Sequence, residues 1–263
     1  MSKVLTERKG RVLVITINRP EKRNCVDAET EDLLVEAWKE FKYDDDLFVA
    51  VLTGAGSEAF CAGADLGGYL PKVSGTPTYL RRRAYDGPGF GGFTRGIDIF
   101  KPILCAVNGA CLAGGLELAI AADIRIAAEH ATFGCLERRW NVGLGDGGTQ
   151  RLPRIVGLGR ALELIITGKL IDAQEAWRIG LVNEVVPAGI LMKRTMELAE
   201  LICSYPQGAI RTDKEATIRG LGTPLTEGLR MESQLFNTLL GTHDLYEGPV
   251  AFLEKRKPEY DNQ

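Results

Sequence analysis

Histidine is scarce in this 263-residue sequence, which holds two of them, His130 and His243. His130 lies in a turn-like link between two strand-like runs and His243 in a polar Gly-Thr-His-Asp link, so we expect both on the surface. This scarcity disfavours a serine–histidine triad and a histidine-rich metal site, and we predict no metal site. Acid–base chemistry in such a chain would fall to carboxylates.

Long apolar runs and paired cysteines are also missing. No uncharged run approaches the ~20 residues of a membrane span, and the N-terminus has no apolar signal core. The six cysteines include no C-x-x-C pair and lie mostly in apolar runs, as small buried residues do in a reducing compartment. The net charge of −3 creates no field that would attract nucleic acid or an anionic membrane. We therefore expect a cytoplasmic protein without membrane or nucleic-acid partners.

Strand-like and helix-like periodicities alternate in the first part of the chain. Strands are predicted over residues 12–17, 48–52, 103–107, 124–127 and 131–133. Asp27 is a predicted N-cap for the amphipathic helix that follows it, and a glycine-opened helix is predicted over residues 115–122. From about Gly147 helices dominate, interrupted by a strand-like run over residues 181–186. This order predicts an α/β core followed by a helical C-terminal region.

The stretch between Leu66 and Phe100 has no clear periodicity and contains several glycines and prolines. Long irregular segments in compact domains are commonly functional loops, and we predict a loop here that covers the substrate.

Two matches to G-x-G-x-x-G, beginning at Gly87 and Gly143, follow no convincing strand and lack a clearly placed acidic ribose partner. A dinucleotide site is therefore not predicted.

Two segments rich in small residues follow predicted strands: FCAGADL at residues 60–66 and NGACLAGGLEL at residues 108–118. Glycine and alanine let a ligand approach main-chain N–H groups, and a helix N-terminus presents free N–H groups at the positive end of its dipole. The same segments are equally compatible with tight turns and close packing. The residues alone leave both interpretations open.

Taken in order, these strings resemble the crotonase, or enoyl-CoA hydratase/isomerase, superfamily. The resemblance also rests on AVNG at 106–109, AGGLELAIAADIRIA at 113–127, ATFG at 131–134 and GGTQRLPRIVG at 147–157. It extends from about residue 10 to EGPVAFLEKRKP at 247–258. It implies a spiral of repeated ββα units over residues 1–200 and a helical region over residues 201–263 that mediates trimerisation and covers coenzyme A.

The resemblance also implies a catalytic site that hydrates a trans-2-enoyl-CoA to a 3-hydroxyacyl-CoA. Ala64 and Gly114 match the residues whose main-chain N–H groups form an oxyanion hole for the thioester carbonyl. Glu117 and Glu137 match the two hydratase glutamates, of which Glu117 would activate water and Glu137 would supply the α-proton. Two neighbouring carboxylates can divide these tasks because their repulsion favours one remaining protonated.

Coenzyme A enters such a reaction as part of the acyl-CoA substrate, so the resemblance implies no separate cofactor. Lys22 and Arg23 match positions near its phosphates, and Gly63 and Asp65 match positions near its adenine. For Lys22 and Arg23, plain surface charge is the alternative, since lysine and arginine are mostly exposed.

The C-terminal pair Phe252 and Lys255 matches residues that reach coenzyme A, often across a subunit boundary. Plain surface charge is again the alternative for Lys255. Members of the superfamily commonly form trimers or paired trimers. The resemblance therefore implies a homotrimer or a hexamer.

One departure from the common pattern concerns Asp146, in LGDGGT at residues 144–149, where typical short-chain hydratases have alanine. In some crotonases an aspartate at this position is catalytic, and aspartate would also suit the N-cap of a helix beginning near Gly147. The first interpretation gives an alternative function, isomerisation of an enoyl-CoA or dienoyl-CoA by Glu137 and Asp146. A further alternative is an RNA-binding member of the superfamily, against which the negative net charge argues.

Overall fold

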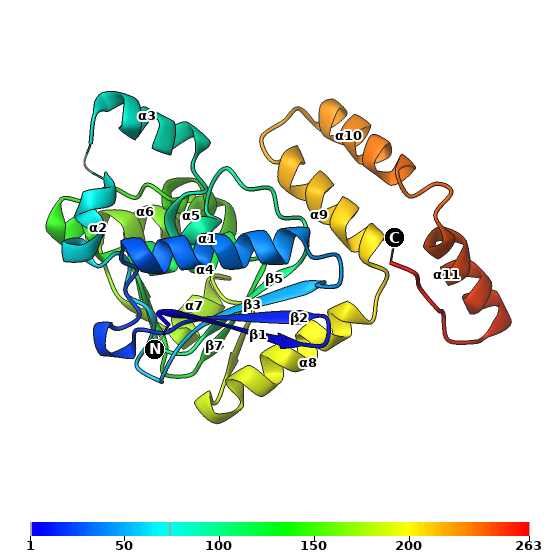
Figure 1. Cartoon of the computed structure of the whole chain (residues 1–263), viewed down its shortest axis with the longest axis horizontal. Helices are drawn as coiled ribbons and strands as arrows, with labels where there is room; N and C mark the ends of the chain where they lie inside the picture. Colours follow the sequence, from blue (N-terminus) through cyan, green and yellow to red (C-terminus); the bar gives the residue numbers. More distant parts are fainter. Residues whose placement is uncertain (1, 74, 263) are drawn as a thin grey trace.

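A six-stranded sheet forms the centre of the computed structural model, which describes residues 2–73 and 75–262 (Figure 1). Across the sheet the strands are β1 (Val4–Lys9), β2 (Val12–Ile17), β3 (Val49–Gly54), β5 (Ile103–Val107), β7 (Ile124–Ala128) and β10 (Glu184–Val186). β1 pairs antiparallel with β2, and the other neighbours are parallel. The predicted strands are found with small shifts of their ends, and the run at 181–186 becomes a strand only from Glu184.

A smaller sheet contains β4 (Ala59–Cys61), β6 (Ala110–Leu112), β8 (Thr132–Gly134) and β9 (Ile171–Asp172), in that order. β3, β5 and β7 of the large sheet are followed in the chain by β4, β6 and β8 of the small one. Helices come next: α2 (Leu66–Val73), α4 (Gly114–Ala121), and, after a 3-10 turn at Leu136–Trp140, α5 (Gly148–Val156). This alternation is the predicted repetition of ββα units, and the α/β class is confirmed.

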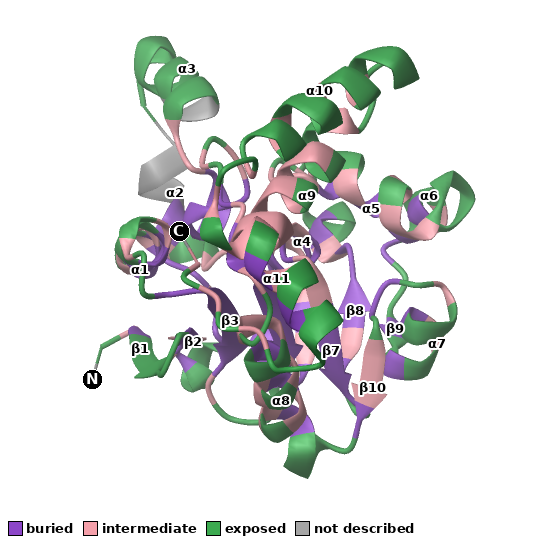
Figure 2. Ribbon diagram, turned by 90° about the vertical axis from the view of Figure 1, so that its right-hand side faces the viewer, coloured by how far each residue is buried: buried purple, intermediate pink, exposed green. Residues whose placement is uncertain are grey.

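The large sheet separates two apolar cores because successive side chains of a strand point to opposite faces. In β2, Leu13 and Ile15 join the core that includes α1 (Ala28–Tyr43), while Val12 and Val14 join the core beneath α8 (Leu191–Cys203). Asp27 caps α1 as predicted, since its carboxylate accepts the Thr30 N–H at 2.9 Å. Figure 2 shows β3 and β7 of the large sheet as buried, whereas the edge strand β1 is mostly exposed.

The predicted irregular stretch between Leu66 and Phe100 is largely helical, so that prediction is wrong. It contains α2, α3 (Pro77–Asp86) and a 3-10 turn at Phe90–Gly92. α3 begins at a Thr-Pro pair, with the Thr76 hydroxyl accepting the Tyr79 N–H at 3.2 Å and proline at the first helical position, where its missing N–H costs nothing. Figure 2 shows most of α3 as exposed, and Arg81 and Arg82 lie on this solvated helix.

The remaining helices are α6 (Leu158–Thr167), α7 (Ala173–Arg178), α9 (Gln207–Gly220), α10 (Leu225–Asn237) and α11 (His243–Glu254). In Figure 1, α10 and α11 project away from the body that contains the sheets. The proposed boundary between residues 200 and 201 falls inside α8, which packs on β3, β5 and β7. Among the described residues, no helix has the length and apolar character needed to cross a membrane.

Candidate active site

Three neighbouring strands of the small sheet deliver the predicted site residues to one edge. β4, β6 and β8 pair in parallel, so their carboxyl ends lie side by side. Ala64 follows β4, Gly114 follows β6, and Glu137 follows β8. The segments after β4 and β6 approach each other closely, because a β-carbon placed on Gly63 would lie 3.1 Å from the nitrogen of Gly114. Gly63 also adopts a φ of +98°, a conformation that favours glycine.

The main-chain N–H groups of Ala64 and Gly114 donate no hydrogen bond to any described residue. Gly114 is the first residue of α4, where an N–H has no partner inside the helix. Ala113, just before it, holds a φ of 53°, which is strained for a residue with a β-carbon. Both free N–H groups belong to residues that line one cavity, as an oxyanion hole would require.

This cavity has a volume of about 510 Å³ and is mostly apolar. Its wall contains Ala64, Gly114, Glu117, Glu137 and Asp146, all of the residues predicted to be catalytic. The remainder of the wall is formed by Arg23, Ala62, Leu66, Tyr69, Phe90, Leu112, Ala113, Leu136, Trp140, Val142, Gly143 and Gly145. The volume and lining suit an acyl group with a few polar anchors.

Glu117 lies in the first turns of α4 with 4% of its surface exposed. Its Oε1 accepts the N–H groups of Asp146 at 2.9 Å and Gly148 at 2.8 Å. Burial raises the pKa of Glu117 to about 7, although these two hydrogen bonds oppose the rise. Because Oε1 is held by two donors, a proton on this carboxyl resides on Oε2. Glu117 can thus gain or lose a proton near neutral pH at one defined atom.

Glu137 lies in the 3-10 turn after β8, with 7% of its surface exposed. Neither of its carboxyl oxygens has a hydrogen-bond partner among the described residues. Burial raises the pKa of Glu137, because a carboxylate without partners is poorly solvated inside a protein. A buried, unpartnered carboxyl group at an apolar cavity is suited to hold a proton and release it to a ligand.

Asp146 does not cap α5, so that interpretation is wrong. The N-cap is Gly147, with a φ of 108°, and no side chain caps the helix. The Asp146 carboxylate instead turns toward a different segment, where Oδ1 accepts the Phe90 N–H at 2.8 Å and the Thr94 hydroxyl at 2.9 Å. Its Oδ1 also lies 3.4 Å from the Arg95 guanidinium.

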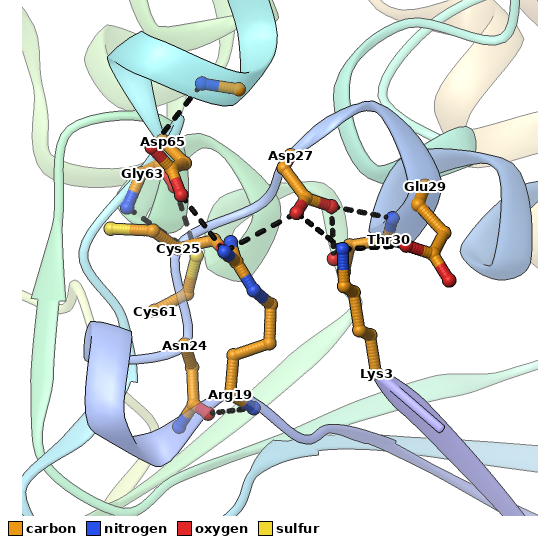
Figure 3. Close-up of polar contacts among 11 residues, drawn as sticks. Lys3, Arg19, Asn24, Cys25, Asp27, Glu29, Thr30, Cys61, Gly63 and Asp65 are labelled. Carbon is orange, nitrogen blue, oxygen red and sulfur yellow. Dashed lines mark hydrogen bonds and ion pairs between the residues drawn. The ribbon is translucent and has the colours of Figure 1, made fainter. Parts of the chain in front are cut away.

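The residues predicted to bind coenzyme A are only partly at the cavity. Arg23 lines it, and its neighbour Lys22 is exposed in the turn before it. Asp65 points away into a polar cluster around Arg19, whose guanidinium lies 2.8 Å from Asp65 and 3.2 Å from Asp27 (Figure 3). The hydrogen bond from Arg19 holds the pKa of Asp65 below its usual value.

Phe252 and Lys255 lie outside the cavity, at the end of α11. Phe252 is 82% exposed and Lys255 is also exposed. In Figure 1, α11 lies beyond α9, apart from the body that contains the sheets. Within one chain, the C-terminal pair therefore does not meet the other predicted residues. No group of three or more potential metal-ligating side chains occurs among the described residues.

Comparison with known families identifies the chain. The family model described as enoyl-CoA hydratase/isomerase matches residues 7–263. The protein belongs to the enoyl-CoA hydratase/isomerase family.

Named relatives of this family cover nearly the whole chain. It is 39% identical to the short-chain-enoyl-CoA hydratase of Clostridium acetobutylicum, over 98% of this chain and 97% of that protein. It is 38% identical to the (E)-benzylidenesuccinyl-CoA hydratase of Thauera aromatica, over 98% of each chain. The crystal structure of an enoyl-CoA hydratase from Bacillus anthracis superposes with a TM-score of 0.88 at 37% identity, covering 99% of this chain and 100% of that one.

The enoyl-CoA hydratase/isomerase motifs did not indicate two residues that shape the site. Phe90 is 3% exposed and lies against Gly114, since a β-carbon on Gly114 would be 2.8 Å from the Phe90 ring. Arg151 donates to the carbonyl oxygens of Asp146 at 3.1 Å and Thr94 at 2.7 Å. Phe90 lay in the stretch predicted to be irregular, and Arg151 lay in a quoted string without a role. Neighbouring residues in the sequence did not indicate either role, because the partners of Phe90 and Arg151 in the site include residues distant in the chain.

Proposed function

We propose that this protein hydrates trans-2-enoyl-CoA thioesters to 3-hydroxyacyl-CoA. The observation that carries the proposal is the meeting of Glu117 and Glu137 in one apolar cavity with the free N–H groups of Ala64 and Gly114. The names of the hydratases of Clostridium acetobutylicum and Thauera aromatica support the same activity.

In the proposed reaction, Oε2 of Glu117 takes a proton from water while the water oxygen bonds to C3 of the enoyl group. The electrons of the C2–C3 double bond shift toward the thioester, and its carbonyl oxygen becomes negative. Glu137 then delivers a proton to C2, so that one water molecule is added in all. The site is restored when Glu117 releases its proton and Glu137 takes one up, by exchange with solvent. The fixed orientation of Glu117 and the absence of described partners for Glu137 suit these separate roles.

The N–H groups of Ala64 and Gly114 would stabilise the negative thioester oxygen. Each such donor, held in place in a dry site, is worth roughly 3–4 kcal/mol in the transition state. The Gly114 N–H also lies at the positive end of α4, which favours negative charge there. The donors are in place before substrate binds, so little reorganisation is needed when charge develops.

The coenzyme A portion of the substrate would approach through the mouth of the cavity near Arg23. Lys22 and Arg23 would contact its phosphates, and the main chain around Gly63 and Asp65 would contact its adenine. The protein requires no cofactor in this proposal, because coenzyme A arrives with the acyl group. We place the protein in the cytoplasm.

The proposed assembly is a homotrimer or a hexamer formed through the C-terminal helices. No residue of α10 is buried, although the helix carries the apolar side chains of Leu225, Leu229 and Phe236. Apolar side chains exposed along a projecting helix favour contact with another subunit. Such contact would also explain why Phe252 and Lys255 lie away from the cavity of their own chain.

The test is incubation of the purified protein with crotonyl-CoA, followed by absorbance of the double bond conjugated to the thioester. Loss of this absorbance together with formation of a 3-hydroxyacyl product is the expected result. The second candidate, isomerisation, is favoured by the position of Asp146 in the cavity wall. Movement of the double bond of a 3-enoyl-CoA, with no hydration of crotonyl-CoA, would establish isomerisation and overturn the proposal.

A further inference from the structure

Asp146 makes hydrogen bonds to two different parts of the site. Its main-chain N–H donates to Oε1 of Glu117 at 2.9 Å. Its carboxylate oxygen Oδ1 accepts from the Phe90 N–H and the Thr94 hydroxyl, 56 and 52 positions away in the chain. One residue thus connects Glu117 to the segment that carries Phe90 in the cavity wall.

We propose that Asp146 is a positioning residue, which fixes Glu117 through its main chain and the Phe90–Arg95 segment through its carboxylate. This inference rests on the proposed hydratase function and extends it to a residue that takes no part in proton transfer. The carboxylate also positions Phe90, whose ring lies against Gly114 and forms part of the cavity wall beside the proposed oxyanion hole.

The surroundings of Asp146 are built for this connection. Gly89 has a φ of +76°, and a β-carbon there would lie 2.2 Å from the Thr94 hydroxyl oxygen and 3.0 Å from Oδ1 of Asp146. Only glycine therefore lets the carboxylate reach both donors. Arg151 bridges the same two segments from the other side by donating to the carbonyl oxygens of Asp146 and Thr94.

One oxygen of the Asp146 carboxylate is tied to the Phe90–Arg95 segment. Oδ1 of Asp146 receives two hydrogen bonds and lies near the Arg95 guanidinium, so this oxygen is committed to protein donors. Glu137, by contrast, has no described partner for either oxygen. Asp146 also acts on Glu117 by charge: burial is the main cause of the raised pKa of Glu117, and the Asp146 carboxylate adds to it.

The test compares Asp146→Asn with Asp146→Ala. Asparagine keeps an acceptor oxygen for Phe90 and Thr94 but removes the charge, whereas alanine removes both. We expect Asp146→Ala to lower hydration of crotonyl-CoA by roughly 30–100-fold, the scale of a misplaced catalytic group, and Asp146→Asn to lose about fivefold or less. In both variants the limb of the kcat/KM profile near pH 7 moves to lower pH, because the carboxylate no longer raises the pKa of Glu117.

Amide hydrogen exchange of the peptide containing residues 89–96 provides a readout that does not need activity. Exchange should accelerate in Asp146→Ala and remain near the wild-type rate in Asp146→Asn. Thr94→Val removes one donor at nearly constant volume and should accelerate exchange of the peptide to a smaller extent. This variant replaces Asp146→Ala in the test if Asp146→Ala fails to fold.

Equal loss of activity in Asp146→Asn and Asp146→Ala would overturn the inference, because the acceptor oxygen that asparagine keeps would then make no difference. Unchanged exchange of the peptide when the acceptor or donor is removed would also overturn it. Absence of hydration by the wild-type protein would instead overturn the proposed function, and the exchange measurement would still decide whether the connection exists.

Discussion

A β-carbon placed on Gly148 would lie 2.9 Å from Oε1 of Glu117, the oxygen to which Gly148 already donates its N–H. The approach of α5 to Glu117 therefore depends on the absence of a side chain at this position. Glycine here serves close contact and not backbone freedom.

Gly148→Ala should displace the Glu117 carboxyl and lower hydration of crotonyl-CoA by about 10–100-fold, since small displacements of a catalytic group are costly. The control is Gly159→Ala in α6, where a β-carbon would meet no atom within 4 Å. That variant should keep its activity and gain up to about 1 kcal/mol in stability from better helix propensity. Steady-state kinetics and urea unfolding of both variants make the comparison. Equal activity of the two variants would show that Glu117 tolerates the displacement.

Much of this site could be predicted because it follows strands with clear patterns. The apolar run at Ile103–Val107 and the small residues after it located Gly114 and Glu117 at the start of a helix. Sequence reasoning failed where the relevant partners are distant. The carboxylate of Asp146 suited a local helix cap, yet its partners Phe90 and Thr94 are more than fifty positions away. Local propensity carries no information about such a contact.

The stretch after Leu66 shows a different kind of failure. Its glycines and prolines are typical of loops, but Pro77 stands at the first position of α3, where proline is favoured. The pair Thr76-Pro77 therefore indicated the start of a helix. The many glycines and prolines around it favoured a loop prediction instead.

Glu117→Gln and Glu137→Gln should each lower turnover by roughly 10²–10⁴, the scale for loss of a general acid or base. Because both groups act on the same addition of water, the turnover of the double variant should be only slightly lower than that of the less active single variant. Turnover of crotonyl-CoA by the three variants, each checked for binding of the product, tests this. Single variants that retain more than a tenth of the wild-type rate would refute the proposed roles.

The raised pKa of Glu117 also predicts how stability depends on pH. The folded-state pKa of about 7 exceeds the ordinary value of 4.5, so the folded protein binds this proton more tightly than the unfolded chain. Stability from this group is complete below about pH 4.5 and is lost as the pH rises toward 7.

Glu117→Gln removes the titration and keeps an oxygen that can accept the N–H groups of Asp146 and Gly148. The variant should therefore gain stability relative to the wild type between pH 5 and pH 8, by on the order of 3 kcal/mol at most. Urea unfolding of both proteins at these two pH values measures the difference. Glu40→Gln, a change on the exposed face of α1, is the control and should show no such gain. A gain for Glu117→Gln that is the same at both pH values would contradict the assignment of this titration to Glu117.

The contact between Gly114 and Phe90 gives a prediction of non-additivity. A β-carbon on Gly114 would lie 2.8 Å from Cε1 of Phe90, whose N–H is held by Asp146 and whose ring is buried. The ring cannot retreat easily, so Gly114→Ala should displace either the ring or the first turn of α4. The N–H of residue 114 would then move away from the thioester oxygen, and kcat/KM should fall by about tenfold or more, since a full loss of such a donor costs about 10²–10³.

Phe90→Leu removes the ring atoms that would collide with the new methyl group. On its own it should cost less than Gly114→Ala, and in the double variant it should restore part of the lost activity. Contacting residues of this kind show interaction energies of about 0.5–3 kcal/mol in double-mutant cycles. The kcat/KM values of the wild type, both single variants and the double variant provide the cycle. If the two losses simply add, the ring does not restrict Gly114, and the requirement for glycine must lie in the path of the substrate itself.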